Sequence, residues 1–151
     1  TDPEGIMENF DALRTDPTGK PQYRLSADRL KHYTGSKRTE LEAPRFVRIN
    51  DETGEVRAVA REGTVSPDGS EVDLRGDVVV ERAARPGQSP MTLKTGRLLV
   101  FPERDQMRAP GAVEVRDDTL EMRAGGMEYD ARQRKIKLTG RVNARYISGR
   151  T

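Results

Sequence analysis

The chain has 151 residues, 27 of them basic and 25 acidic, which gives a formal net charge of +2 at pH 7. That length suits a single domain, which we place over residues 1–151 with a folded part from 8 to 146. Because both signs of charge are mixed along the sequence, nothing indicates a nucleic-acid partner. There is no cysteine, so disulfides and cysteine-based metal sites or catalysis are excluded.

No apolar run approaches the roughly 20 residues that a membrane helix needs. The longest strongly apolar run is Leu98 to Phe101. Since the chain begins at Thr1 rather than at methionine, we expect that an upstream signal or anchor has been removed.

Apolar and polar residues alternate along most of the chain, which predicts half-buried β-strands. In chain order the alternation covers residues 23–27, 56–60, 72–74, 120–124, 136–138 and 142–146. Turn signals rich in proline, glycine and aspartate separate these runs, at residues 16–19, 51–54, 67–69, 86–87 and 125–126. No segment of a dozen residues carries a helical stripe, so the sequence predicts an all-β domain.

A strand-like unit interrupted at its middle recurs four times along the sequence. The copies are TELEAPRFV, EVDLRGDVV, QMRAPGAVE and KIKLTGRVN, with Arg45, Gly76, Gly111 and Gly140 in the same central slot. A related strand precedes each copy. Because glycine inside a strand indicates a bulge or bend, each unit should bend around a shared interior. The repeats therefore predict a twisted β-jelly roll of two facing antiparallel sheets built from strand-turn-strand units.

The sequence offers little chemistry for catalysis. His32 is the only histidine and no supporting triad accompanies it, so we expect a surface or capping role. The acidic pairs Asp117-Asp118 and Glu40/Glu42 lack a calcium-loop pattern, and adjacent carboxylates in a strand point to opposite faces. No glycine-rich loop precedes a helix to hold a phosphate. We therefore expect no enzyme activity, no catalytic residue, no metal and no cofactor.

The apolar faces of the predicted strands form one long seam of Leu, Val, Met and Ala. Such a seam can be a filled core or a trough for an apolar ligand. Slender, flexible side chains suit acyl chains as well as ordinary packing. Taken by itself the seam favours a core, because apolar strand faces are usually buried.

Most of the chain, from about Asn9 to Tyr146, resembles a known family. The segments that carry the likeness are ENFDALRTDPTGKPQYRLSADRLKHY, ELEAPRF, SPDGSEVDLRGDVVVER, MTLKTGRLLVFPERDQMRAPGAVEV and MRAGGMEYDARQRKIKLTGRVNARY. Together they resemble the periplasmic domain of the LptC family, the inner-membrane-anchored component of the lipopolysaccharide transport bridge. Single motifs also occur in the related bridge protein LptA, and the combination favours LptC.

The resemblance implies a β-jelly roll whose facing sheets open into a groove for the acyl chains of lipopolysaccharide. It implies that lipopolysaccharide passes from the inner-membrane ABC transporter to the periplasmic bridge protein. The C-terminal edge would receive an LptA-like protein and the N-terminal edge, from Phe10 to Arg14, would face the LptB/LptF/LptG transporter. The chain would be the soluble periplasmic part of a protein held at the periplasmic face of the inner membrane by a single helix absent from this sequence.

Candidate groove residues come from two sources. The resemblance implies Phe10, Leu25, Leu41, Leu74, Ile136 and Tyr146, whereas strand alternation indicates Leu93, Val113, Met122, Leu138 and Val142. The candidate partner edge strands carry Phe10, Leu13, Val142, Ala144 and Tyr146. Rim arginines such as Arg24 or Arg141 are candidates for contacting lipid phosphates.

Three alternatives stay open beside lipopolysaccharide transfer by an LptC-type domain. The chain can be an LptA-like bridge protein, a structural β-repeat interaction module without a lipid ligand, or an enzyme of unknown type.

Overall fold

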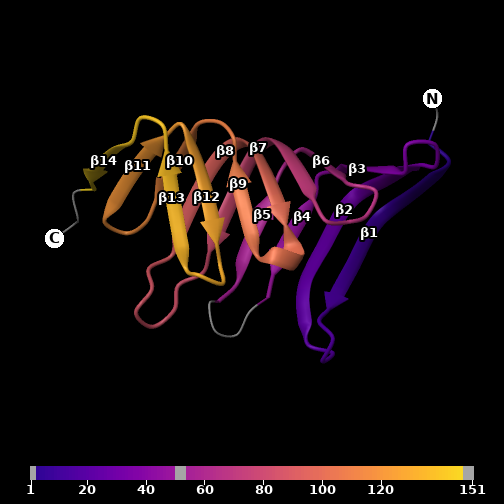
Figure 1. Cartoon of the computed structure of the whole chain (residues 1–151), viewed down its shortest axis with the longest axis horizontal. Helices are drawn as coiled ribbons and strands as arrows, with labels where there is room; N and C mark the ends of the chain where they lie inside the picture. The colour runs from indigo at the N-terminus through magenta and orange to yellow at the C-terminus, as the bar shows by residue number, and fades with distance from the viewer. Residues whose placement is uncertain (1–2, 50–53, 148–151) are drawn as a thin grey trace.

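The computed structural model describes residues 3–49 and 54–147, and it confirms the all-β prediction (Figure 1). The strands are β1 Gly5–Thr15, β2 Pro21–Tyr33, β3 Arg38–Glu42, β4 Arg45–Arg48, β5 Val56–Val59, β6 Glu62–Val65, β7 Val72–Arg82, β8 Met91–Phe101, β9 Gln106–Ala109, β10 Val113–Arg116, β11 Leu120–Ala124, β12 Gly126–Asp130, β13 Lys135–Thr139 and β14 Asn143–Tyr146. A 3₁₀ turn, η1 Pro102–Arg104, joins β8 to β9. Of the predicted turn at 51–54, only Gly54 lies within the described residues.

All described strands belong to one antiparallel sheet that is folded into two layers. Layer A contains β3, β6, residues 72–75 of β7, residues 97–101 of β8, and then β9, β12 and β13. Layer B contains residues 23–26 of β2, then β4, β5, residues 78–82 of β7, residues 91–95 of β8, and then β10, β11 and β14. The predicted β-jelly roll of facing layers is confirmed, and the layers are continuous with each other through their bent strands.

The bends follow from local backbone geometry near the four predicted slots. Gly76 has φ +86°, and the register of β7 against β8 shifts between residues 75 and 78. Gly140 has φ +77°, a left-handed conformation that glycine adopts without strain. In the first repeat Ala43 and Pro44 form the bend, and Arg45 is the first residue after it. Gly111 lies in the link from β9 to β10.

The bends and the hairpin turns lie on opposite edges of the molecule. In Figure 1 the bends run along the upper edge, and the turns at 83–90, 102–105 and 131–134 run along the lower edge. We call this lower edge the mouth. The first and last described strands lie at the two far sides, because β1 pairs with β2 alone among the described strands, while β13 and β14 are the last described strands of layers A and B.

The core lies between the layers and extends along the molecule. It consists mainly of alternate residues of the strands from β2 to β12, whereas β1 contributes only the half-buried Phe10. Its most buried large side chains include Leu41, Phe46, Val72, Leu74, Val78, Leu98, Val100 and Val115. Because the strands are half-buried, their outer faces carry the charged residues, as the alternation predicted. Within the described residues the fold has no helix that is long and apolar enough to cross a bilayer.

Candidate functional site

Two facing rows of side chains border the interior just inside the mouth. In layer B the strand register aligns one residue from each of β2, β4, β5, β7 and β8, namely Tyr23, Arg48, Val56, Arg82 and Met91. In layer A the register aligns Val72, Val100, Met107, Tyr129 and Ile136. Both rows contribute to the same two small pockets, so their side chains point toward each other.

These rows are apolar except for two cations, Arg48 and Arg82. Both arginines end a strand whose preceding inward residues are core, Phe46 in β4 and Val80 in β7. Side chains two positions apart share one face of a strand, so each guanidinium is directed into the interior at the mouth. The arrangement is unusual, since an inward arginine needs a partner to offset its desolvation.

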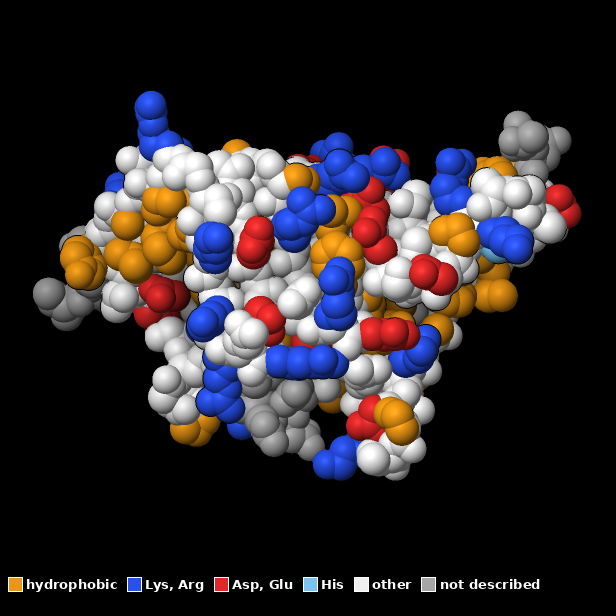
Figure 2. Space-filling view, viewed as in Figure 1, with side chains coloured by type: hydrophobic (Ala, Val, Ile, Leu, Met, Phe, Trp, Pro, Cys, Tyr) orange, Lys and Arg blue, Asp and Glu red, His pale blue; other side chains and the backbone are white. Residues whose placement is uncertain are grey.

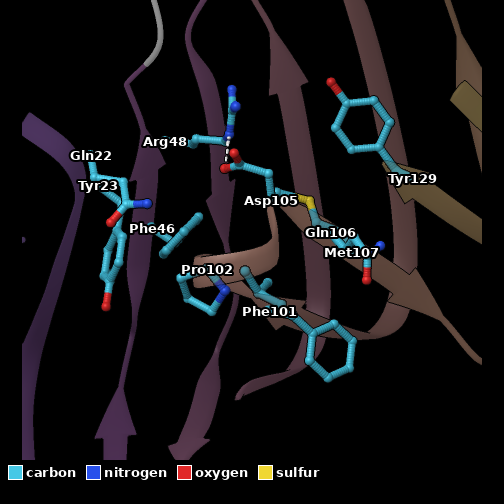
Figure 3. Close-up of a pocket in the computed structure, with 11 residues that line it drawn as sticks. Gln22, Tyr23, Phe46, Arg48, Phe101, Pro102, Asp105, Gln106, Met107 and Tyr129 are labelled. Carbon is cyan, nitrogen blue, oxygen red and sulfur yellow. Dashed lines mark hydrogen bonds and ion pairs between the residues drawn. The ribbon is translucent and has the colours of Figure 1, made fainter. Parts of the chain in front are cut away.

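Arg48 finds its partner in the opposite layer (Figure 3). Its Nε lies 2.6 Å from Oδ1 of Asp105, which the turn after η1 holds at φ +53°. The side chains are only 7% and 15% exposed. The second carboxylate oxygen of Asp105 accepts from Arg132, at 3.3 Å. This ion pair joins layer B to layer A across the mouth.

Close packing surrounds the ion pair. The rings of Tyr23 and Phe46 lie 5.3 Å apart with a tilt of 34°, and Phe101 and Pro102 approach from the other layer. Only about 10 Å³ of unfilled space remains here, roughly the minimum for one water molecule. At this position the mouth is closed.

Arg82 has a different environment. Its Nη2 donates to the carbonyl of Ser89 at 3.0 Å, but its buried Nε has no hydrogen-bond partner among the described residues. Beside it lies an apolar pocket of about 30 Å³, lined by Leu93, Met107, Met127 and Ile136 among others. The two layers are therefore nearly in contact along the seam.

The structure places all the predicted groove residues along this interior or at its C-terminal end. Five are buried in the core: Leu25, Leu41, Leu74, Leu93 and Val113. Phe10, Met122 and Leu138 are half-buried against it. The last three are more open, with exposed fractions of 39% for Ile136, 46% for Val142 and 85% for Tyr146.

Two of the exposed members, Ile136 and Tyr146, still belong to the inward faces. Buried Val115 pairs with Met122, which pairs with Ala144, so Ala144 and Tyr146 share the inward face of layer B. In layer A, Ile136 pairs with Tyr129 and Leu138 with buried Met127. Figure 2 shows apolar side chains gathered at this end, near β11, β13 and β14. Among residues 3–49 and 54–147, nothing therefore covers the apolar seam at this end.

Four of the five predicted edge residues lie on strands with one unpaired side in the part of the chain that the structure describes. Phe10 and Leu13 are in β1, which pairs only with β2, and Leu13 is 48% exposed. Ala144 and Tyr146 are in β14, which pairs only with β11, while Val142 lies in the bend before it. Within residues 3–49 and 54–147 nothing covers either outer edge.

The remaining polar candidates have local structural partners. His32 Nδ1 lies 3.1 Å from Thr39 Oγ1. The carboxylate of Asp117 accepts from the amides of Thr119 and Leu120 at 2.9 and 2.8 Å, and the Thr119 bond foremost holds the Asp117 pKa below its usual value. No group of three or more potential metal ligands occurs in the part of the chain that the structure describes.

The two acidic strand residues and the two rim arginines are exposed or paired. Glu40 accepts from the Tyr33 hydroxyl, and Glu42 lies 3.5 Å from Lys31. Arg24 forms an ion pair with Asp11. Arg141 lies in the bend between β13 and β14, on the edge opposite the mouth. The sequence analysis did not identify Arg48 or Arg82. The signal for both is strand alternation, because Arg48 lies two positions after the core residue Phe46 and Arg82 two positions after Val80.

Bent strands that fold one antiparallel sheet into two layers around an apolar seam define a β-jelly roll. The family model described as "LptC: Lipopolysaccharide-assembly, LptC-related" matches residues 1–147, and the chain therefore belongs to this family. Membership supports a role in lipopolysaccharide transport and confirms the resemblance found in the sequence. The family is a transport-bridge component rather than a known enzyme family.

A solved structure is similar to the chain over most of its length. It is LptH from Pseudomonas aeruginosa, described as the LptA homologous periplasmic component of the conserved lipopolysaccharide transport device. The TM-score is 0.65 at 10% sequence identity, covering 84% of this chain and 95% of LptH. At that identity the likeness shows the fold alone. No curated protein sequence matches the chain significantly.

Proposed function

We propose that this domain carries the acyl chains of lipopolysaccharide in the seam between its layers. It receives lipopolysaccharide from an inner-membrane ABC transporter and passes it to an LptA-like periplasmic bridge protein. The domain acts at the periplasmic face of the inner membrane, and energy for transport comes from the transporter.

The observation that carries this proposal is the uncovered C-terminal end of the seam. There Ile136 and Leu138 of layer A and Met122 and Tyr146 of layer B expose inward-facing apolar surface. An ordinary closed core ends in polar or covering residues, whereas exposed apolar surface of this kind marks a binding site. A second jelly roll placed against this end would continue the seam.

Acyl chains need the layers to separate. Ligand pockets usually occupy roughly 300–1,000 Å³, about ten times or more the 30 Å³ that is unfilled beside Leu93 and Ile136. The bent strands hold the layers together at the upper edge, so separation is easiest at the mouth. The slender side chains Met91, Met107 and Met127 lie where the space would form and can change rotamer to accommodate a chain.

The partner edges follow from the same end of the fold. The outer sides of β13 and β14 present unpaired backbone groups, and neither strand contains proline to block pairing. Strand addition by an LptA-like protein would satisfy these groups. At the opposite end β1 offers the corresponding edge to the transporter, with Ile6, Met7 and Leu13 exposed beside it.

Site-specific photocrosslinking tests the proposal with controls inside the same strands. A photoreactive residue at Ile136, Leu138 or Tyr146 should crosslink to lipopolysaccharide. The same residue at Lys137 or Arg145 should not, because these positions face outward between the inward ones. Equal crosslinking at inward and outward positions would contradict a groove. Partner binding without any lipid crosslink would favour the structural interaction module instead.

A charge placed in the seam gives an independent test. Ile136→Asp should weaken lipopolysaccharide binding while the far-ultraviolet spectrum stays β-type, because position 136 is 39% exposed and tolerates a carboxylate. Leu41→Asp puts the charge at a site that is 2% exposed and should unfold the domain. Unchanged lipid binding by Ile136→Asp would remove position 136 from the groove.

His32→Ala should leave transport intact.

A further inference from the structure

Three arginines surround an open pocket at the mouth, and the proposed acyl seam does not use them. Arg82 of β7, Arg85 of the turn after it and Arg134 of the β12–β13 turn line this pocket, which holds about 350 Å³ of open space. Tyr129 and Ile136 line it as well. Arg82, Tyr129 and Ile136 also line the apolar pocket beside Leu93, so a polar compartment and an apolar one share a wall.

The described residues supply no carboxylate to this cluster. Arg82, Arg85 and Arg134 form no ion pair with any of them, whereas Arg48 in the same row is paired with Asp105. The Arg82 charge contributes weakly to the lowered Asp117 pKa, but that carboxylate is held by its own turn. The amide of Gln88, which also lines the pocket, donates to the Ala83 carbonyl.

Two of the guanidinium groups have buried nitrogen atoms without acceptors among the described residues. These atoms are Nε of Arg82 and an Nη of Arg85. Buried polar atoms in native proteins are nearly always hydrogen-bonded, and a cationic donor is costly to leave without a partner. Planar guanidinium groups with free donors match the oxygens of a phosphate or carboxylate. Such a constellation is expected where an external anion completes the site.

We propose that Arg82, Arg85 and Arg134 bind a phosphate group of an amphipathic ligand whose acyl part enters the neighbouring apolar pocket. The anion site stands on the arginine geometry alone. Its assignment to a lipid phosphate rests on the proposed function, because the shared wall of Tyr129 and Ile136 puts both parts of one molecule within reach. The site replaces the rim arginines Arg24 and Arg141 as the phosphate contact, since Arg24 is paired and Arg141 lies on the far edge.

A titration with inorganic pyrophosphate tests the anion site without lipid. In the ¹⁵N-labelled domain at low ionic strength, the side-chain Nε–H signals of Arg82, Arg85 and Arg134 should shift saturably. The signal of Arg141 should not, because this arginine lies at the opposite edge. Shifts of equal size at Arg141 would show an adventitious ion only, bound without preference among arginines, and would overturn the site. The absence of a saturable shift at Arg82 would overturn the site as well.

Lipid binding then identifies the source of the phosphate. The wild-type domain should bind lipopolysaccharide about tenfold more tightly than its enzymatically dephosphorylated form, the size expected for charge-assisted hydrogen bonds. Arg82→Leu should abolish this difference and raise the melting temperature, because it removes an unpaired buried donor. Arg141→Leu, with the same loss of charge, should preserve the difference.

The outcomes separate the two proposals. Pyrophosphate binding with no binding of either lipid supports the anion site and contradicts the acyl seam. Lipid binding that is equal for the two forms supports the seam and overturns the lipid-phosphate assignment. A lower melting temperature for Arg82→Leu would mean that the Arg82 Nε has an acceptor in solution, against the unsatisfied donor on which the site depends.

Discussion

The ion pair between Arg48 and Asp105 gives the sharpest test of how the mouth is held. It joins layer B to layer A through a 2.6 Å contact that is almost entirely buried. Replacing Asp105 with alanine leaves the Arg48 guanidinium inside the mouth without this carboxylate. The same change releases Arg132, but that side chain is 61% exposed and water replaces its partner.

The expected loss of stability follows from burial. Breaking a buried ion pair by removing one partner costs about 3–5 kcal/mol, against about 0–1 kcal/mol for an exposed pair. We expect about 3 kcal/mol, the lower end, because Asp105 keeps 15% exposure. For a domain of this size that loss corresponds to a fall of roughly 6–12 °C in melting temperature. Because the pair closes the mouth, the variant should also take up lipopolysaccharide faster.

Urea unfolding followed by circular dichroism measures the free energy, and a double-mutant cycle with Arg48→Met isolates the pair. The double replacement Arg48→Met with Asp105→Leu should recover most of the lost stability, since apolar residues of similar volume replace buried pairs at little cost. A loss below about 1 kcal/mol for Asp105→Ala would refute the reasoning, because that is the value for a solvated pair. Coupling near zero in the cycle would do the same.

Three further predictions concern the C-terminal half. Gly140→Ala should lower the free energy of unfolding by about 1–3 kcal/mol in a urea melt, because φ of Gly140 is +77°. Gly111→Ala should change it by less than about 0.5 kcal/mol, because Gly111 lies in open space without a positive φ. Equal effects of the two substitutions would contradict the bend geometry. Deleting residues 142–151 should abolish binding to an LptA-like protein in a pull-down and leave a cooperative thermal melt, since β14 is exposed throughout; an unfolded product would show that this strand belongs to the core. The hydrogen bond from the Arg145 guanidinium is the largest cause that holds the Glu121 pKa below its usual value. The stabilisation of β14 by this pair is therefore complete at neutral pH and is lost as the pH falls through the lowered pKa of Glu121. Hydrogen-exchange protection of β14 that is the same at pH 3 and pH 7 would count against this role.

Alternation and glycine spacing predicted the strands and bends because both depend on neighbouring residues. The pairing of Arg48 with Asp105 could not be predicted, since the partners are 57 positions apart and only the folding of the sheet brings them together. Alternation also does not distinguish Leu74, which is fully buried, from Tyr146, which is 85% exposed on an inward face. That difference depends on where the facing layer ends, and the facing layer is made by other strands.

The two free strands at the C-terminal end have a consequence for partner choice. Because β13 and β14 end different layers of one folded sheet, a partner must offer two strands at a matching separation to satisfy both. Once the first strand has paired, the second is held at high effective concentration, so a correctly spaced partner gains avidity from the second contact. A single stray β-strand from a misfolded chain satisfies only one edge and dissociates sooner. If an LptA-like partner pairs with both strands as proposed, the open-ended sheet remains available for assembly without becoming a seed for aggregation.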